Sequence, residues 1–237
     1  MSYWDSLNGA VKKNSAKPFY TWISDTGRIE LSGATFLNAV SKASNFLTDG
    51  LELESETRVD IQLGNHWQSP VWLGTALTLG LTVTDLDSDL TFGVKSQAET
   101  WQGSTDGFVV VSQDPFGMPD KDIPAGFVNG SAEVRNFGDH FSPVWPISPD
   151  HAAIEFQLAE STWNDLAIRA RELAEQHGIE LGHSFGIHGT SDLLTTISLQ
   201  VVLPATNGNS VVLIDQANAD FDVIKKHEKL EQIVMLG

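Results

Sequence analysis

The residues Gly182-His183-Ser184-Phe185-Gly186 form a G-x-S-x-G pattern. In serine hydrolases such a pattern makes a tight strand-to-helix turn that exposes a nucleophilic serine. Asp192 and His227 follow Ser184 in the order that a triad on that fold needs. However, Gly189 interrupts the expected helix, and only about 50 residues remain for the rest of such a fold. We therefore favour an ordinary turn, and a serine hydrolase using Ser184, His227 and Asp192 is the alternative.

The acidic segment Asp85-Leu86-Asp87-Ser88-Asp89 begins like a calcium-binding loop. The sixth loop position is Leu90 where glycine is needed, and the twelfth is Ser96 where glutamate is needed. An acidic turn at a strand end is therefore expected. The histidines do not cluster either, since His183 and His188 have a spacing that suits neither a helix face nor a strand face. No metal site is expected.

Three residues are candidates for ligand binding because of their place in the chain. His66 and Trp67 lie in a loop after an expected strand, and Asp85 follows the next expected strand. Parallel α/β sheets bind ligands at the carboxyl ends of their strands. The predicted ligand-binding residues are therefore His66, Trp67 and Asp85. The plainer interpretation of Trp67 is that its indole only packs against the protein.

A phosphate-binding loop is missing from the sequence. Neither G-x-x-x-x-G-K-[ST] nor G-x-G-x-x-G occurs. The expected strand 152–158 continues into Ala159-Glu160-Ser161-Thr162, without glycine or lysine. Such a segment cannot wrap successive N–H groups around a triphosphate, and Glu160 would repel one. No cofactor is expected.

Composition limits the classes of partner. The chain has 237 residues, 14 Lys and Arg against 31 Asp and Glu, a net charge of −17 and no cysteine. This charge disfavours nucleic acids and anionic membranes, and the lack of cysteine excludes disulfides and thiolate chemistry. The first residues show no secretory signal, so a cytoplasmic location is expected. An unknown small molecule or a protein remains as the partner.

Strands that alternate with helices predict an α/β fold with largely parallel sheets. Strands are expected at 20–23, 28–31, 58–63, 81–83, 108–111, 152–158, 210–214 and 232–236. Helices are expected at 34–48, 69–80, 162–177, 192–203 and 220–229, with Ser69 as a cap and Pro204 as a terminator.

The Pro- and Gly-rich segment 113–150 separates two expected α/β subdomains, 1–112 and 151–237, unless the chain forms one compact domain. Its aromatic residues predict an ordered excursion that packs against the core, and they are Phe116, Phe127, Phe137, Phe141 and Trp145.

In order along the chain, several segments resemble the N-terminal part of the AMP-binding, acyl-adenylate-forming enzymes. Segment 29–38 is similar to the "LTYAELN" motif of that family, 58–65 to "DRVAILLPN" and 77–87 to "LKAGAAYVPLD". Segment 150–156 resembles the strand that leads into the nucleotide loop, and 203–213 is similar to "PLLAGASVVL". The whole chain is more closely similar to a short actinobacterial family described as a distant, truncated relative of those enzymes. Segments 113–119 and 133–139 carry this second resemblance.

The resemblance implies a two-lobed α/β fold like the N-terminal domain of acetyl-CoA synthetase-like enzymes. The parent family's Gly/Ser/Thr-rich loop, its later Tyr-Gly-x-Thr-Glu motif and its C-terminal domain with the catalytic lysine have no counterpart here. No catalytic residue of that family is therefore assigned to this chain. The resemblance implies a pseudoenzyme, catalytically incomplete, that binds a small ligand or a protein partner, or else a subunit completed by another chain.

Overall fold

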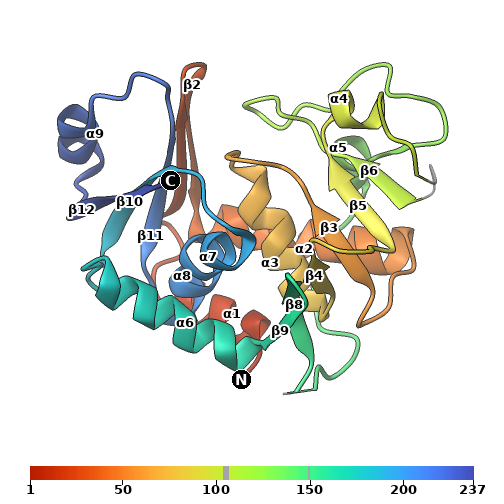
Figure 1. Ribbon diagram of the computed structural model, residues 1–237, viewed down its shortest axis with the longest axis horizontal. Coiled ribbons are helices and arrows are strands. Elements are labelled where there is room, and N and C mark those ends of the chain that lie inside the picture. Colours follow the sequence, from red (N-terminus) through yellow and green to blue (C-terminus); the bar gives the residue numbers. More distant parts are fainter. Residues whose placement is uncertain (104–106, 149) are drawn as a thin grey trace.

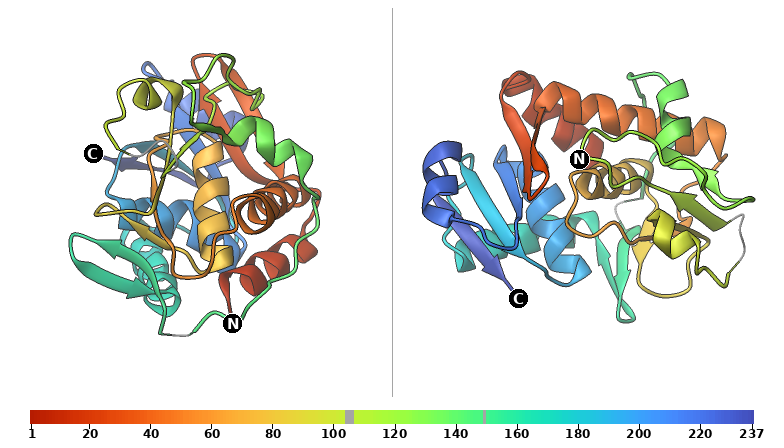
Figure 2. Two further views of the ribbon diagram at one scale, coloured as in Figure 1. Left: turned by 90° about the vertical axis from the view of Figure 1, so that its right-hand side faces the viewer. Right: turned by 90° about the horizontal axis from the view of Figure 1, so that it is seen from above.

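The computed structural model describes residues 1–103, 107–148 and 150–237. Two mostly parallel sheets stand apart, and helices fill the space between them and cover their outer faces (Figures 1 and 2). One large hydrophobic cluster runs through both sheets and the helices between them. The predicted α/β class with two-lobed, mostly parallel sheets is confirmed.

The first sheet, sheet A, joins the beginning and the end of the chain. Its strand order is β12-β10-β11-β1-β2, and only the β1–β2 pair is antiparallel. The strands are β1 (Pro18–Ser24), β2 (Gly27–Ser32), β10 (Ser184–Gly189), β11 (Ser210–Asp215) and β12 (Gln232–Leu236). The apolar strand β11 is buried in the middle of the sheet, as its continuous Val-Val-Leu-Ile run predicts.

The second sheet, sheet B, takes its strands from the middle of the chain. Its order is β7-β6-β5-β3-β4-β8-β9, and only the β8–β9 pair is antiparallel. The strands are β3 (Arg58–Ile61), β4 (Thr82–Thr84), β5 (Leu90–Gly93), β6 (Phe108–Val110), β7 (Val128–Asn129), β8 (Ala152–Phe156) and β9 (Ala159–Thr162). Predicted strands 58–63, 81–83, 108–111 and 152–158 all lie in this sheet.

The helices begin where the sequence provides a cap. Ser32 accepts the N–H of Thr35, and Thr162 and Asp165 form the expected capping box. The helices are α1 (Tyr3–Lys13), α2 (Gly33–Asn45), α3 (Gln68–Leu79), α4 (Lys95–Ala98), α5 (Gly130–Glu133), α6 (Trp163–Gln176), α7 (Leu193–Ile197), α8 (Leu203–Asn207) and α9 (Phe221–Glu228). All twelve residues of α3 are buried, because this helix lies between the sheets and is apolar on every side.

Two helix boundaries differ from the prediction. Helix α3 begins at Gln68, so Ser69 lies inside it and is not its cap. Pro204 does not end the helix that starts at Leu193, since a π turn over Ser198–Val202 leads into α8, which extends to Asn207. Proline lacks the N–H that an α-helical turn needs, and a π turn just before it rearranges the hydrogen bonds there.

The segment 113–148 lies against the rest of the molecule through some of its aromatic side chains. Phe141 is buried against Trp4, and the Trp145 Nε1–H donates to the Leu79 carbonyl at 2.9 Å. The prediction is wrong for Phe116, which is 79 % exposed. Among the described residues, every helix is too short or too polar for a transmembrane segment.

Candidate functional site

The carboxyl ends of the two sheets meet at the loop that follows β3. The Asn65 side-chain amide donates to the Gly189 carbonyl at the end of β10, at 3.0 Å. The Trp22 indole N–H, from β1, donates to the Asn65 carbonyl at 2.9 Å. Two hydrogen bonds therefore tie this sheet B loop to sheet A, and they position the next residue, His66, at the junction.

His66 is 1 % exposed and lies edge-on against Trp22, with ring centroids 4.6 Å apart. Its Nδ1 accepts the Gln68 N–H at 3.3 Å, while its Nε2 is buried without a hydrogen-bond partner among the described residues. Burial lowers the pKa of His66 to about 4, and the Asp114 carboxylate opposes this shift only in part. His66 is therefore a neutral imidazole at pH 7 with one free nitrogen.

Trp67 is half-buried and fixes the segment after β6. Its indole N–H donates to the Pro115 carbonyl at 3.0 Å. The neighbouring Gln68 amide donates to the Ser112 carbonyl at 2.7 Å. Trp67 is thus packed, as its plainer interpretation holds, and its ring lies next to the His66 ring, with centroids 5.6 Å apart.

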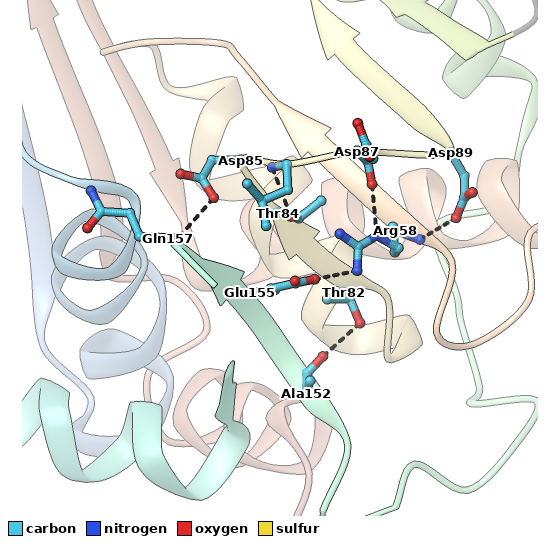
Figure 3. A network of polar contacts seen from close by, with 10 residues as sticks. Arg58, Thr82, Thr84, Asp85, Asp87, Asp89, Ala152, Glu155 and Gln157 are labelled. Carbon is cyan, nitrogen blue, oxygen red and sulfur yellow. Dashed lines mark hydrogen bonds and ion pairs between the residues drawn. The ribbon is translucent and has the colours of Figure 1, made fainter. Parts of the chain in front are cut away.

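Asp85 lies at the carboxyl end of β4, where it contacts the β8–β9 turn (Figure 3). Its carboxylate accepts the Gln157 N–H at 3.1 Å. Burial and the nearby Asp85 carboxylate raise the pKa of Asp60, on the adjacent strand β3. This edge of sheet B is therefore negative and partly dehydrated.

The rest of the acidic segment is paired with Arg58, at the start of β3 (Figure 3). The Arg58 N–H donates to Asp89 at 2.9 Å, and the Arg58 Nε–H donates to the Asp87 carbonyl at 2.8 Å. The guanidinium also forms an ion pair with Glu155 on β8. The segment is an acidic turn, as expected, and no group of three or more His, Asp or Glu able to hold a metal occurs in residues 1–103, 107–148 and 150–237.

The turn between β8 and β9 consists of two residues, Gln157 and Leu158. Phe156 pairs directly with Ala159 across it. Both turn residues have positive φ, 50° and 66°, as a two-residue type I′ hairpin requires. The chain thus reverses within two residues after β8, at the place where the resemblance to AMP-binding enzymes implies a phosphate-binding loop.

The structure separates the three residues of the hydrolase alternative. Ser184 is the first residue of β10, so it lies at the amino end of a parallel strand and not on a strand-to-helix turn. Asp192 follows the opposite end of β10, where its carboxylate caps α7 and accepts from Thr195. His227 is exposed on α9. These three side chains form no triad.

His66, Trp67 and Asp85 all follow the carboxyl ends of strands in sheet B, as the order of the chain predicts. The sequence did not indicate Trp22 and Asn65, which fix the loop before His66, or Arg58, which pairs with the acidic segment. Asn65 and its acceptor Gly189 are 124 residues apart in the chain. No local pattern signals such a contact, because it depends on how the two sheets dock.

Solved structures of adenylating enzymes have this fold. Acetoacetyl-CoA synthetase from Streptomyces lividans matches with a TM-score of 0.77 and 13 % identity over 99 % of this chain and 42 % of its own. An acyl-CoA synthetase from Brucella canis matches with a TM-score of 0.74 and 12 % identity over 97 % of this chain and 47 % of its own. Coronafacic acid ligase from Pectobacterium brasiliense matches with a TM-score of 0.73 and 17 % identity over 99 % of this chain and 50 % of its own. The chain therefore has the fold of the N-terminal part of AMP-binding enzymes and spans about half of their length.

A curated relative comes from Mycobacterium tuberculosis and is named as a TIGR03089 family protein. It is 31 % identical over an alignment of 158 positions that covers 58 % of this chain and 63 % of the relative. No protein-family model matches the chain. The structural matches show the shared fold, and the sequence match shows similarity to a TIGR03089 family protein over part of the chain.

Proposed function

We propose that this protein has the fold of an adenylating enzyme but binds a small ligand without activating it with ATP. The observation that supports this most is the two-residue hairpin at Gln157 and Leu158. Adenylation joins a carboxylate to the α-phosphate of ATP and releases pyrophosphate. The charge that develops on the phosphates has to be met by Mg²⁺, cationic side chains and backbone N–H groups.

The hairpin offers few such groups. Residues 152–162 contain no glycine, lysine or arginine, and the Gln157 N–H already donates to Asp85. Removing a single preorganised donor from a site of this kind costs roughly 3 kcal/mol of transition-state stabilisation. Losing a whole loop of donors would remove most of the catalysis.

The negative charge at the carboxyl edge of sheet B also opposes the binding of ATP. Asp60 and Asp85 lie at the carboxyl edge of sheet B, and Glu155 neutralises the nearby cation, Arg58. A triphosphate entering this edge would meet carboxylates. The proposed ligand is therefore uncharged or cationic, and the neutral His66 and the Trp67 indole are its expected contacts.

Exchange of labelled pyrophosphate into ATP tests the lack of activation. We expect no exchange with a panel of carboxylic acids under conditions in which an authentic acyl-CoA synthetase is active. Calorimetry should detect no binding of ATP–Mg²⁺ tighter than about 1 mM, a free energy near −4 kcal/mol. Exchange that depends on any carboxylic acid would overturn the proposal.

Mass spectrometry of small molecules retained by the protein from its native cells tests ligand binding. Trp67→Ala should lose the retained molecule. Trp145→Ala is the matched control, because that indole is also half-buried and also donates to a carbonyl, but at another place. A molecule lost from Trp145→Ala and kept by Trp67→Ala would refute the proposed place of binding, and retention of no molecule would refute binding itself.

The hydrolase alternative has a separate test. Ser184→Ala should leave any ester hydrolysis unchanged, because Ser184 begins a strand and faces no His–Asp pair. Labelling of Ser184 by a fluorophosphonate probe would reverse this conclusion.

A further inference from the structure

The loop 114–118, which follows β6, is held in one shape by hydrogen bonds to its first residue. The Asp114 carboxylate accepts the N–H groups of Phe116 and Met118, at 2.8 and 3.1 Å. The Asp114 carbonyl accepts the N–H of Gly117 at 2.8 Å. The side chains of Phe116 and Met118 are 79 % and 52 % exposed. The loop is therefore ordered, and it presents its apolar side chains to solvent.

Arg135 holds the same loop from a neighbouring segment, the short 3₁₀ turn Val134–Asn136. Its Nη2 donates to the Gly117 carbonyl at 2.9 Å and to the Met118 Sδ at 3.4 Å. A thioether is a weak acceptor, so the second contact adds little to the first. No carboxylate pairs with Arg135 in residues 1–103, 107–148 and 150–237, and its charge is therefore available to a stronger acceptor beside it.

The sulfur atoms of this protein all belong to methionines, because the chain has no cysteine. Met1 is 94 %, Met118 is 52 % and Met235 is 57 % exposed, so a small oxidant reaches each of them. Among the described residues, only the Met118 sulfur accepts a hydrogen bond. Met235, on the edge strand β12, is similarly exposed but lacks such a donor, and it serves as the internal comparison.

We propose that Met118 is a site of oxidation by peroxides and that Arg135 captures the sulfoxide formed there. In the reaction a lone pair of the sulfur attacks one oxygen of hydrogen peroxide, and the O–O bond breaks. The departing hydroxide takes the proton of the transferred oxygen and leaves as water. The sulfur is oxidised by two electrons, and the peroxide is reduced to water.

The sulfoxide changes the contact with Arg135 in a defined way. Its oxygen is polar, and it forms within reach of a guanidinium that already contacts the sulfur. A hydrogen bond from a charged donor is roughly twice as strong as one between neutral groups. Oxidation therefore ties the loop 114–118 more firmly to Arg135, and reduction releases it.

The loop also contacts Trp67, which links the oxidation site to its surroundings. The Trp67 indole N–H donates to the Pro115 carbonyl at 3.0 Å, and a Cβ on Gly117 would lie 3.0 Å from the indole ring. A more firmly held loop thus also holds this indole. The inference does not depend on the function proposed above, because its tests use neither ATP nor a ligand.

Amide hydrogen exchange of the full chain before and after treatment with hydrogen peroxide tests the proposal, and peptide mass spectrometry identifies the oxidised methionines. Met118 and Met235 should both be oxidised. Exchange of the amides in 114–118 should then slow about fivefold, the gain from one surface hydrogen bond to a charged group. Methionine sulfoxide reductases should restore the original rate. Unchanged or faster exchange after oxidation of Met118 would overturn its capture by Arg135, and a Met118 that stays reduced while Met235 is oxidised would overturn the site.

Three variants separate this contact from general effects of peroxide. Arg135→Gln removes the charged donor, so oxidation should change loop exchange by less than about twofold. Met118→Leu has no sulfur in the loop and should show no response to peroxide. Met235→Leu is the matched control and should keep the full fivefold slowing. Slowing that survives in Arg135→Gln or Met118→Leu, or that disappears in Met235→Leu, would contradict the proposal.

Discussion

Two regions beside sheet B treat their polar side chains in opposite ways. Along the acidic segment 85–89, Arg58 from the amino end of β3 is hydrogen-bonded or paired with Asp87, Asp89 and Glu155, and Asp85 at the carboxyl end of β4 accepts a hydrogen bond from the hairpin after β8 (Figure 3). Near the starts of α1 and β8, the Tyr3 hydroxyl and the His151 Nε2 are buried without hydrogen-bond partners among the described residues. Paired groups hold loops in place, whereas unpaired buried groups cost stability.

This contrast bears on how the fold is used. Ligands of parallel α/β sheets usually bind at the carboxyl ends of the strands. Here the short hairpin and Asp85, which accepts its hydrogen bond, occupy part of that edge, where the His66 Nε2 is buried without a partner among the described residues. A partly open cavity of about 120 Å³ lies at the opposite, amino end, which such folds rarely use. The following experiments measure these regions separately.

The largest effect is expected from the pH dependence of stability at His66. Its pKa is about 4 in the folded protein and 6.5 when exposed, so only the unfolded chain takes up a proton between these values. Because the folded protein holds the pKa of this base below its usual value, the free energy of unfolding falls as the pH falls below 6.5. The loss should be about 2 kcal/mol between pH 7 and pH 5, and about 3 kcal/mol below pH 4.

Urea unfolding of the wild type and of His66→Gln at several pH values checks this prediction. Glutamine does not titrate, so the variant should lack this part of the pH dependence whatever its stability at pH 7. Parallel curves for the two proteins between pH 7 and pH 5 would show that His66 is not buried as a neutral imidazole.

Arg58→Ala tests whether pairing stabilises the acidic segment 85–89. The variant leaves the half-buried Glu155 without its cation and the Asp87 carbonyl without its donor. We expect a loss of about 2 kcal/mol in the free energy of unfolding, typical for hydrogen bonds to charged groups. Arg171→Ala is the control, since Arg171 is exposed on α6, and it should change stability by less than about 0.5 kcal/mol. Similar losses in both variants would refute a special role of the Arg58 network.

Much of the fold was predictable because its signals are local. The apolar run of β11 and the capping box of α6 each specify their element within a few residues. Strand β10 was missed because two glycines in Ser184–Gly189 weaken the strand pattern, and its place in the sheet depends on pairing with β11 and β12. Helix α1 was missed although Ser2 and Asp5 form a capping box.

The sites were predictable only in part, for a related reason. His66 and Asp85 follow strands, and that order alone places them at one sheet edge. The amino-end cavity depends on Ile147, which packs against Gly80 from a segment without regular structure. It also depends on Tyr3 reaching Gly74 and Trp163. Such contacts between distant parts of the chain leave no periodic pattern in the sequence.

Gly74→Ala tests how tightly the Tyr3 ring is held at the amino end. The new Cβ would lie 2.6 Å from the Tyr3 hydroxyl, so the ring or α3 has to move, at an expected cost of about 2 kcal/mol. In a Tyr3→Phe background the nearest atom of that ring would be 3.3 Å away, and the cost should fall by about 1 kcal/mol. A double-mutant cycle of urea unfolding measures this coupling. Additive effects would mean that the hydroxyl is not in contact with Gly74.

The smallest effect separates two tyrosines that are buried to the same extent. Tyr3 is 2 % and Tyr20 is 1 % exposed, but among the described residues only the Tyr20 hydroxyl has a partner, Gln200. Tyr20→Phe leaves the Gln200 oxygen unpaired and should lower the free energy of unfolding by about 1 kcal/mol. Tyr3→Phe removes a hydroxyl that has no bond to lose, so it should raise that free energy by about 1 kcal/mol. Thermal and urea unfolding of the ligand-free variants measure both changes. Opposite signs would mean that the Tyr3 hydroxyl stays buried at the expense of stability. A loss of stability in Tyr3→Phe would mean that its hydroxyl is already satisfied in the free protein, and the contrast between the paired acidic segment and the unpaired Tyr3 hydroxyl would disappear.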